Sequence, residues 1–543
     1  MRRLFFLFSA LIPLAILLTS HFVSPHALWA LIPLSPLLAL GFYDVFQKKH
    51  AIRRNFPLLG HVRYLAEKVR PEIQQYFIEQ AEEGRPFSRN IRSVVYQRAK
   101  KQLATRPFGT QLDVYEQGYE FVNHSLQPLH CDPRELRVLV GGRDCKKPYS
   151  ASILNISAMS YGSLSSNAIR ALNGGAHLGA FAHNTGEGGL SPHHEAGGGD
   201  IIWEIGTGYF GCRDEQGRFS AEAFREKAIR DQVKMIEIKL SQGAKPGHGG
   251  ILPAKKVTSE IAAIRGIPMG KDCVSPPGHS AFSSPLEMVR WIQQLRDLSG
   301  GKPIGIKLCV GKRREFLALM KAVHETGIAP DYIVVDGGEG GTGAAPMEFS
   351  DHVGTPLNEG LVFVHNSLVG INRRKDVKVF VAGRITTGFD MIAKMSMGAD
   401  VCYSARGMML ALGCIQALQC NQNTCPTGVA TNDPHLMVGL DITDKRVRVK
   451  NFHEQTVESV AELLGAMGLK HSQELRPWHL MHRIGAFEIK HYGELFDYIA
   501  PGALLGKDLP PAFARAWKMA SSDSWLAIDD RATQGSFGYR AAA

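Results

Sequence analysis

Short apolar runs, many of them rich in β-branched residues, alternate with helical stretches from about residue 150 onward. Each run has the length of a buried strand, and most meet glycine, serine or a charged residue at or just past their end. The eight runs lie at 153–160, 181–189, 235–240, 271–275, 303–309, 332–338, 378–383 and 401–406. Strands that alternate with helices in this way predict a (β/α)8 barrel with its active site at the carboxyl ends of the strands. A doubly wound sheet is the alternative, but no GxGxxG opens a helix after the first run.

Three cysteines follow the last of these runs at short spacing. Cys414, Cys420 and Cys425 stand in GCIQALQCNQNTCPTGVAT, and a proline follows the third. Thiolates spaced this closely can converge on one soft-metal centre, including an iron–sulfur cluster. Packing as small buried hydrophobes is the alternative, and a zinc ribbon fits badly because the triplet has no paired CxxC. We therefore predict a metal centre beside the carboxyl end of the eighth strand.

Two apolar runs without any charge begin the chain, at 4–19 and 27–43. Each is a little shorter than the roughly 20 residues that a spanning helix needs. Basic residues precede the first run and follow the second, while the linker between the runs has no Lys or Arg. The positive-inside rule then predicts a transmembrane hairpin over 1–47, in the cell membrane, with both ends and the catalytic region in the cytoplasm. A cleaved signal peptide is the alternative for the first run.

The charge balance separates the N-terminal region from the rest. Of 62 Lys and Arg and 51 Asp and Glu, residues 1–106 contain 16 and 6, which leaves 46 and 45. A basic segment next to apolar runs favours contact with anionic lipid, and we expect no nucleic-acid partner. We predict a basic helical connector over 48–130, the barrel over 131–470 and a C-terminal extension without a readable motif over 471–543.

The predicted strand ends offer small residues and glycines suited to a phosphorylated, planar cofactor. Ser157, Met159, Ser160 and Gly162 follow the first strand. Glycines at 337, 338, 383 and 407 follow the sixth, seventh and eighth strands, where many barrels bind a phosphate. Lys307 is a single cation within the apolar fifth strand. It faces either a flavin edge or a substrate carboxylate, or else extends along the barrel rim to solvent.

Six motifs of the barrel region resemble the flavin-binding synthase domain of glutamate synthases, in particular the smaller FMN-binding glutamate synthase family proteins. They are MSYGSLS (159–165), NTGEGG (184–189), IKLSQGAKPGHGGILP (238–253), SPPGHS (275–280), DGGEGGTGAAP (336–346) and ALGCIQALQCNQNTCPTGVAT (411–431). The last matches the three-cysteine signature of that family throughout. The resemblance covers most of the chain outside the apolar runs.

The resemblance implies FMN beside a 3Fe-4S cluster, and an oxidoreductase that forms glutamate from 2-oxoglutarate and ammonia through 2-iminoglutarate. Cys414, Cys420 and Cys425 are the implied cluster ligands. The residues implied to lie along FMN are Ser157, Met159, Ser160, Gly162, Lys307, Gly337, Gly338, Gly383 and Gly407. The implied catalytic residues are Lys307, Lys239 and His248. Lys239, Gln242 and Lys245 belong to one motif, and structural polar groups at a strand end are the alternative for these three.

Departures from the family pattern touch the substrate side more than the flavin side. His248 replaces an acidic residue in GHGG, and SPPGHS keeps His279 while losing its neighbour. Arg384 stands beside the expected phosphate, where a guanidinium is chemically suitable, so we count it among the cofactor-binding residues. Cofactor identity is thus better defined by the sequence than substrate identity.

The sequence read here, which begins MRRLFF, contains no N-terminal catalytic cysteine of a glutaminase and no GxGxxG fingerprint for NAD(P)H. Electrons are therefore expected from ferredoxin, a reductase subunit or a membrane donor. Nitrogen is expected from ammonia, an amine or a separate amidotransferase. The alternatives are the same cofactors acting on another amine or 2-oxo acid, a membrane electron-transfer module, and a barrel that has lost its cofactors.

Overall fold

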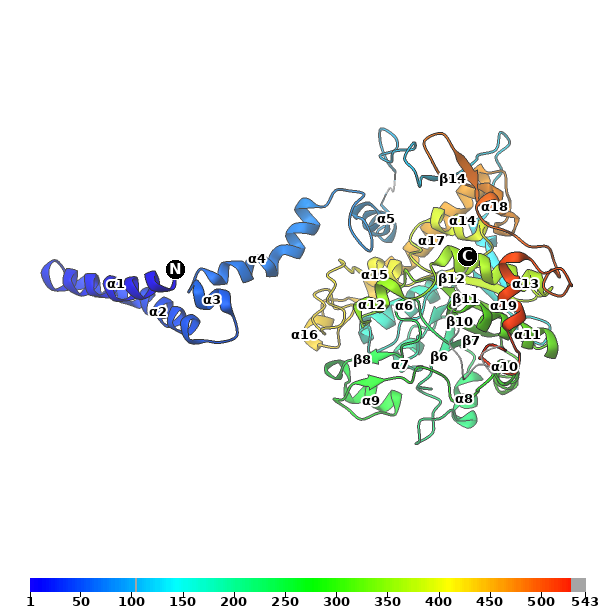
Figure 1. Ribbon diagram of the computed structural model, residues 1–543, viewed down its shortest axis with the longest axis horizontal. Coiled ribbons are helices and arrows are strands. Elements are labelled where there is room, and N and C mark those ends of the chain that lie inside the picture. Colours follow the sequence, from blue (N-terminus) through cyan, green and yellow to red (C-terminus); the bar gives the residue numbers. More distant parts are fainter. Residues whose placement is uncertain (103–104, 529–543) are drawn as a thin grey trace, which may run out of the picture. The chain divides into compact units, whose positions relative to one another are not determined.

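The computed structural model describes residues 1–102 and 105–528 and divides into two compact units, Met1–Asn90 and Ile91–Ala543. In the larger unit eight parallel strands close into a barrel, which confirms the predicted fold (Figure 1). The barrel strands are β4 (Leu154–Ile156), β5 (His183–Asn184), β6 (Ile201–Ile205), β7 (Val233–Lys239), β10 (Ile304–Cys309), β11 (Tyr332–Asp336), β12 (Lys378–Ala382) and β13 (Val401–Ser404).

One of the eight predicted barrel strands is wrong. The run 271–275 forms β9 (Cys273–Val274), which pairs with β8 (Ile251–Leu252) in a two-stranded ribbon outside the barrel. The third barrel strand is instead β6, all five residues of which are buried. Cys273 is buried but Val274 is exposed, so the ribbon has only one covered face. Consequently the IKLSQGAKPG motif follows the fourth barrel strand.

Helices connect the barrel strands and cover the outside of the barrel (Figure 1). They are α6 (Ser166–Gly179), α7 (Pro192–Glu195), α8 (Ala221–Ala228), α9 (Ser259–Arg265), α10 (Pro285–Leu298), α11 (Arg313–Thr326), α12 (Met347–His352), α13 (Leu357–Gly370), α14 (Gly388–Ser396), α15 (Arg406–Leu412), α16 (Pro434–Met437) and α17 (Ile442–Ala466). Side-chain caps begin several of them: Ser165 accepts from the amide of Ala168 and Thr387 from that of Asp390. Such caps satisfy amides that have no partner inside the helix.

The barrel interior is filled by side chains whose level is set by strand register. Glu204 on β6 is in register with Glu237 on β7, and Lys239 is in register with Lys307 on β10. Gly305 makes room for an aromatic ring, because a Cβ there would lie 2.3 Å from the ring of Tyr332. Gly305 is in register with Tyr332 and Glu237, and Lys239 and Lys307 lie two residues nearer the carboxyl ends of their strands.

Smaller elements flank the barrel in the same unit. These are α5 (Arg89–Ala99), the ribbon of β2 (Arg137–Val140) and β3 (Tyr149–Ser152), the sheet of β1 (Glu120–Val122), β14 (Leu480–Arg483) and β15 (Ile489–His491), and α18 (Tyr492–Leu495) and α19 (Pro511–Met519). β1 comes from the predicted connector and pairs with β14 from the predicted C-terminal extension. Phe513 of α19 stacks on Phe363 of α13, with ring centroids 5.4 Å apart. Residues 529–543 of that extension lie outside the described residues.

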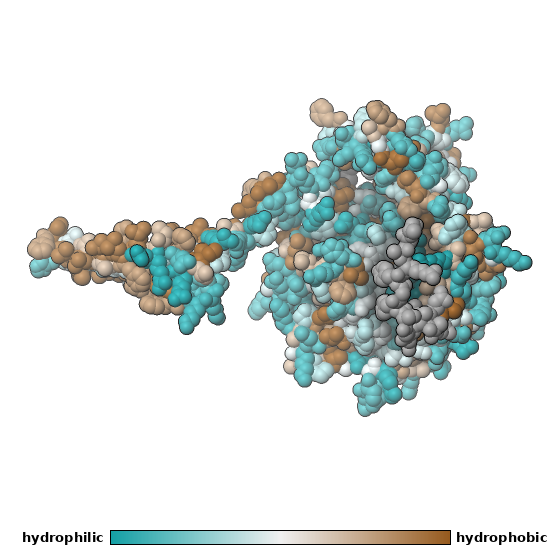
Figure 2. Space-filling view, viewed as in Figure 1, coloured by the Kyte–Doolittle hydropathy of each residue, from teal (hydrophilic) through white to brown (hydrophobic). Residues whose placement is uncertain are grey.

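The smaller unit consists of helices. They are α1 (Arg2–Phe22), η1 (Pro25–Ala30), α2 (Leu31–Phe46), α3 (Ala51–Asn55), α4 (Gly60–Ile73) and η2 (Gln74–Ile78). Arg2–Phe22 and Pro25–Phe46 are long and apolar enough to cross a membrane. Hydrophobic residues cover most of both helices, as Figure 2 shows. Asp44, fully buried, contacts His61 at 2.8 Å and accepts the amide of Leu58 at 3.0 Å, which fastens the end of α2 to the start of α4.

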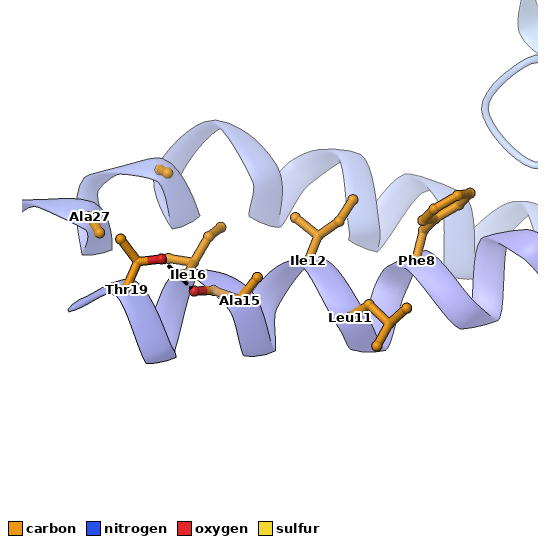
Figure 3. A pocket seen from close by; sticks show the side chains of 8 residues that line it. Phe8, Leu11, Ile12, Ala15, Ile16, Thr19 and Ala27 are labelled. Atoms are coloured by element: carbon orange, nitrogen blue, oxygen red, sulfur yellow. Dashed lines mark hydrogen bonds between the residues drawn. The ribbon is translucent and has the colours of Figure 1, made fainter. Parts of the chain in front are cut away.

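A groove of about 460 Å³ lies between the two apolar helices, and it has no titratable group among its lining residues (Figure 3). Phe8, Ile12 and Ile16 line it, and the Thr19 hydroxyl is satisfied by the carbonyl of Ala15 at 2.9 Å. Such a lining suits hydrocarbon and gives no basis for chemistry. The candidate site must therefore be sought in the barrel.

Candidate functional site

A charged cluster lies where β5, β6 and β7 end at the carboxyl face of the barrel. The ammonium of Lys239 contacts Glu187 Oε1 at 2.8 Å and Gln242 Oε1 at 2.8 Å. Burial raises the pKa of Glu187, but attraction from Lys239, Arg265 and Lys245 outweighs it and holds that pKa below its ordinary value. Glu187 is therefore an anion that is surrounded by cations.

Lys245 is the unusual member of this cluster. Its side chain is 1% exposed, and among the described residues its ammonium has no hydrogen-bond partner. Burial lowers the pKa of Lys245, attraction from Glu187 opposes the shift, and repulsion from Lys239 adds to it. A buried ammonium without a hydrogen bond is unfavourable, and an anionic ligand would supply the missing partner.

A cavity of about 20 Å³ adjoins the cluster and is lined by Glu187, Thr207, Lys239, Gln242, His248 and Pro276, among others. It has room for about one water molecule. His248 is half-buried, and its Nδ1 lies 3.0 Å from its neighbour's carbonyl, Gly249 O. Behind the cluster, His279 holds the carbonyl of Lys239 at 2.9 Å, and burial lowers the pKa of His279 to about 4. A neutral imidazole thus fixes the end of β7.

Lys307 lies inside the barrel, in register with Lys239 on the neighbouring strand. It is 4% exposed and contacts Glu204 Oε2 at 3.1 Å, so it does not reach solvent at the rim. Burial lowers its pKa, but Glu204, Asp336 and Glu237 outweigh burial and raise that pKa overall. Glu237 accepts from Asn184 at 2.9 Å and from Tyr403 at 3.2 Å. Burial raises the pKa of Glu237 to about 8, against attraction from Lys307. Lys307 therefore belongs to a buried network of charged groups inside the barrel.

The loop after β4 contains four of the predicted cofactor residues. Ser157 continues the strand pairing, because its amide donates to Ser404 O at 3.1 Å. Met159 and Ser160 are each 8% exposed, and Gly162 has φ +101, a conformation that favours glycine. Gly186 presses against this loop, since a Cβ there would lie 2.7 Å from the amide nitrogen of Ser160. The NTGEGG segment (184–189) thus packs directly against this loop.

The ends of β11, β12 and β13 bring two guanidinium groups together. Burial lowers the pKa of Arg406 to about 10, and repulsion from Arg384 adds to the shift. Arg406 donates to Glu339 O at 2.7 Å, and Arg384 is exposed at φ +51. Two cations that repel each other at strand ends form a suitable place for a phosphate.

The predicted phosphate glycines have mainly packing roles among the described residues. The amides of Gly337 and Gly338 donate to Ala382 O at 3.3 Å and Thr355 O at 3.0 Å. A Cβ on Gly383 would meet Leu357 at 2.9 Å, and one on Gly407 would meet Ser404 Oγ at 2.4 Å. These glycines shape the strand ends.

The three cysteines lie on one loop between α15 and α16, and their thiols interact electrostatically. Burial and then repulsion from Cys425 raise the pKa of Cys420, while burial raises that of Cys414 to about 11. Burial also acts on Cys425, but hydrogen bonds led by Thr427 lower its pKa. In the part of the chain that the structure describes, no group of three His, Cys, Asp or Glu side chains could hold a metal ion. The cluster assignment stays a prediction.

A buried lysine, Lys256, bonds to the loop that contains these cysteines. Lys256 is 3% exposed and donates to Ser163 O and Ala430 O, each at 2.9 Å. Burial lowers its pKa to about 8, and attraction from Cys420 and Cys425 opposes the shift. Its contacts join the loop after β4 to the cysteine loop.

Lys239, Gln242 and His248 line one cavity, and Lys245 belongs to the charged cluster of Glu187 and Lys239 without lining that cavity. Lys307 pairs in register with Lys239 and contacts Glu204 inside the barrel. Sequence analysis missed Glu187, Glu204, Lys256 and Arg406. Glu187 and Arg406 stand at strand ends, a position that could have indicated them. Glu204 lies on strand β6, which was not predicted, and no motif around Lys256 marks it as a site residue.

Comparison with known proteins places this chain in one family. A profile described as "conserved region in glutamate synthase" matches residues 95–470. The glutamate synthase large subunit-like protein YerD of Bacillus subtilis is 37% identical over 81% of this chain and 91% of its own length. The archaeal glutamate synthase [NADPH] of Methanocaldococcus jannaschii is 32% identical over 66% of this chain and 72% of its own.

Solved structures resemble the chain only distantly. Mandelate oxidase with (S)-4-hydroxymandelic acid aligns with 80% of this chain and 98% of its own, at 15% identity and a TM-score of 0.42. The profile match and the two sequence relatives are the basis of the assignment. This chain belongs to the glutamate synthase family and is an oxidoreductase.

Proposed function

We propose that this chain is a membrane-anchored FMN and iron–sulfur oxidoreductase that forms glutamate by reductive amination of 2-oxoglutarate. The observation that carries the proposal is the buried ammonium of Lys245, which has no hydrogen-bond partner among the described residues. It lies at the carboxyl end of a family barrel, beside an ion pair of Lys239 and Glu187. A dicarboxylate would complete the hydrogen bonding of this cluster.

Charge supports a dianionic substrate. Two ammonium groups and one carboxylate give the cluster a net positive charge, which favours an anion in a site of low dielectric. The present cavity of about 20 Å³ is smaller than a dicarboxylate. Binding therefore requires the 244–250 loop to move outward.

Bound FMN would supply a hydride to the imine carbon, and an iron–sulfur cluster would supply electrons one at a time. The protein groups act on the substrate itself. Lys245, whose pKa burial lowers, is suited to protonate the carbonyl oxygen as ammonia adds and water leaves. Lys239 is held by Glu187 and Gln242, so it can orient a carboxylate rather than move a proton.

The residues at the strand ends fit a flavin phosphate. Burial lowers the pKa of Arg406, and repulsion from Arg384 adds to the shift. A phosphate between them would remove that repulsion. The loops after β4 and β5 approach closely at Gly186, where a Cβ would lie 2.7 Å from the amide nitrogen of Ser160, and we assign the ring system to these loops.

The cysteine loop fits a cluster in its chemistry. The three thiols interact electrostatically, and the buried Lys256 bonds to Ala430 O of the same loop. Thiolate ligation is the usual mode for iron–sulfur clusters. We test the ligands with Cys420→Ser in the purified protein, using Cys402→Ser as a control at a buried cysteine on β13. Cys420→Ser should lose iron and Cys402→Ser should keep it, whereas unchanged iron in Cys420→Ser would contradict the assignment.

The reaction is tested by product analysis with a reduced artificial donor, 2-oxoglutarate and a panel of amines. Glutamate formed with ammonia supports the proposal. An N-substituted glutamate or another amino acid would indicate the same cofactors with a different amine or 2-oxo acid. Reduction of flavin and cluster without any product would indicate an electron-transfer module. The names of relatives mention NADPH and ferredoxin, so both are tried as physiological donors.

Membrane anchoring rests on α1 and α2, whose apolar side chains are largely exposed. Lipid would cover these side chains and fill the groove between the helices (Figure 3). Deletion of residues 1–47 should release the protein into the soluble fraction. Replacing Leu11 and Leu37 by alanine is a control that keeps both helices and should leave the protein in the membrane. Membrane retention after the deletion would contradict the anchor.

A further inference from the structure

Helix α4 of the smaller unit uses one side to contact α2 and α3. A Cβ on Gly60 would lie 2.8 Å from Arg53 Cα, and the Arg53 guanidinium lies 4.5 Å from the ring centre of Tyr64. His61 contacts Asp44 of α2 at 2.8 Å. Tyr64 follows Gly60 by four residues and His61 by three, so these three residues share one face of the helix.

The side of α4 away from these contacts is an apolar stripe. Five residues follow one another there at steps of three or four, and each is between 38% and 63% exposed: Val62, Leu65, Val69, Ile73 and Tyr76. Tyr76 lies in η2, which continues from α4 without a break in helical backbone. A helix of a soluble protein normally turns such a stripe toward a core. The stripe of α4 therefore calls for an apolar partner.

Basic side chains border this stripe. Arg63 and Arg70 are seven residues apart along one border, and Lys68 lies toward the other. Residues 48–70 contain seven basic residues against the single acid Glu67, namely Lys48, Lys49, Arg53, Arg54, Arg63, Lys68 and Arg70. An apolar stripe with basic borders suits the surface of an anionic bilayer, where long cationic side chains reach the headgroups.

The start of α4 is fixed close to the end of the second apolar helix. Asp44 is fully buried two residues before α2 ends at Phe46, and it accepts the amide of Leu58 at 3.0 Å besides its contact with His61. The stripe of α4 thus begins near the point where α2 would leave the hydrocarbon of a membrane. It is continuous with the surface that the proposed hairpin places in lipid.

The spacing of the stripe speaks against a second copy of this helix as the partner. A heptad seam that starts at Val62 needs apolar residues at 62, 65, 69, 72 and 76. Position 72 is a glutamate, and the stripe passes to Ile73 instead. Lipid has no such requirement of register, because it accepts any continuous apolar surface.

We propose that α4 lies on the cytoplasmic surface of the membrane and binds anionic phospholipid, with its stripe between the headgroups and the acyl chains. The inference rests on the membrane anchoring in the proposed function, because the hairpin brings α4 to that surface. Arg63, Lys68 and Arg70 would contact lipid phosphates and carboxylates. Without residues 1–47 the helix also lacks Asp44, and one short interfacial helix binds reversibly, so that the deletion still releases the chain at high salt.

The test measures hydrogen exchange of the 61–73 amides in the full-length chain, in nanodiscs that hold one chain each. One set of discs contains phosphatidylcholine alone, and the other contains phosphatidylcholine with about 30% phosphatidylserine, the lipid that attracts basic segments. A helix of this length is marginal without a partner, so docking should control its exchange. Exchange is expected to be about tenfold slower in the discs with phosphatidylserine.

Two variants separate the stripe from the charge. Leu65→Glu places a carboxylate within the stripe, whereas Gln74→Glu adds the same charge seven residues after Glu67, on the polar side. Leu65→Glu should lose the slowing that phosphatidylserine causes, and Gln74→Glu should keep most of it. A Leu65→Glu chain that is slowed as much as the wild type would overturn the role of the stripe.

The remaining outcomes separate this inference from the anchor. Equal exchange in the two kinds of disc overturns the binding of anionic lipid by α4 and leaves the hairpin standing. Slower exchange only in discs that hold two chains would indicate a second copy as the partner and would likewise overturn the proposal. A wild-type chain that does not enter either kind of disc would overturn the anchor, and with it the inference.

Discussion

Replacement of Lys245 by methionine should change ligand affinity and stability in opposite directions. The side chain is 1% exposed and its ammonium has no hydrogen-bond partner among the described residues. Methionine has a similar length and no charge. The substitution should therefore leave the packing of the 244–250 loop intact while it removes the cation.

The magnitudes follow from the burial of this group. A hydrogen bond to a charged group contributes about 1.5–3 kcal/mol, so loss of the ammonium should raise the Kd for 2-oxoglutarate by roughly 10- to 150-fold. Removing an unsatisfied buried ammonium should also raise the free energy of unfolding of the ligand-free protein by about 1–3 kcal/mol. A purely structural lysine would show a loss of stability instead.

The affinity is measured by isothermal titration calorimetry with 2-oxoglutarate, and stability by urea unfolding without ligand. Lys375→Met is the control, because Lys375 is exposed and precedes β12 at the amino face of the barrel. It should change neither quantity. An unchanged Kd in Lys245→Met, or a ligand-free protein that unfolds more easily, would refute the reasoning.

Three further outcomes follow from the barrel itself. Lys307→Met leaves Glu204 buried without its cation and should lower the free energy of unfolding, measured in urea, by about 3–5 kcal/mol. The double variant Lys307→Met with Glu204→Gln should recover part of that loss. Gly243→Ala would place a Cβ 1.7 Å from Gly337 O and should destabilise the protein by about 1–3 kcal/mol or more, whereas Gly311→Ala, with nothing within 4 Å, should be neutral in thermal unfolding. The pKa of Glu237 is raised to about 8 from 4.5, so the folded chain keeps a proton that the unfolded chain releases. That contribution to stability is complete below about pH 4.5 and is lost as pH rises through about 8. Glu237→Gln should therefore flatten a plot of the free energy of unfolding against pH. An unchanged slope in that plot would mean that other groups cause the pH dependence.

Much of the fold could be predicted because parallel strands buried on both faces leave a strong apolar signal. Seven of the eight predicted strands are barrel strands. The missed strand β6 contains Trp203 and Glu204 between isoleucines, and the charge interrupted the run. That charge is tolerated because Lys307 meets it across the barrel at 3.1 Å. A pairing between strands so far apart in sequence cannot be found from local pattern.

The site could be predicted in part for a similar reason. Strand ends in a barrel meet at one face, so Lys239, Lys245 and His248 could be placed near one another from one motif. The lack of a partner for Lys245 is a property of tertiary packing and needed the structure. The phosphate glycines were predicted for a ligand, yet Gly383 and Gly407 are required by contacts with Leu357 and Ser404. A glycine in sequence does not say whether a ligand or the protein occupies the space beside it.

The seam between β13 and β4 has a consequence for how the protein matures. Cys402 pairs with Leu154, 248 positions earlier in the chain. Synthesis at about 5–20 residues per second leaves β4 without this neighbour for roughly 12–50 seconds. During that time its open edge is available for wrong pairing. The loop with Cys414, Cys420 and Cys425 emerges later still and docks on residues beside β4. Insertion of the proposed cluster would then be among the last events of biosynthesis, after the barrel has closed.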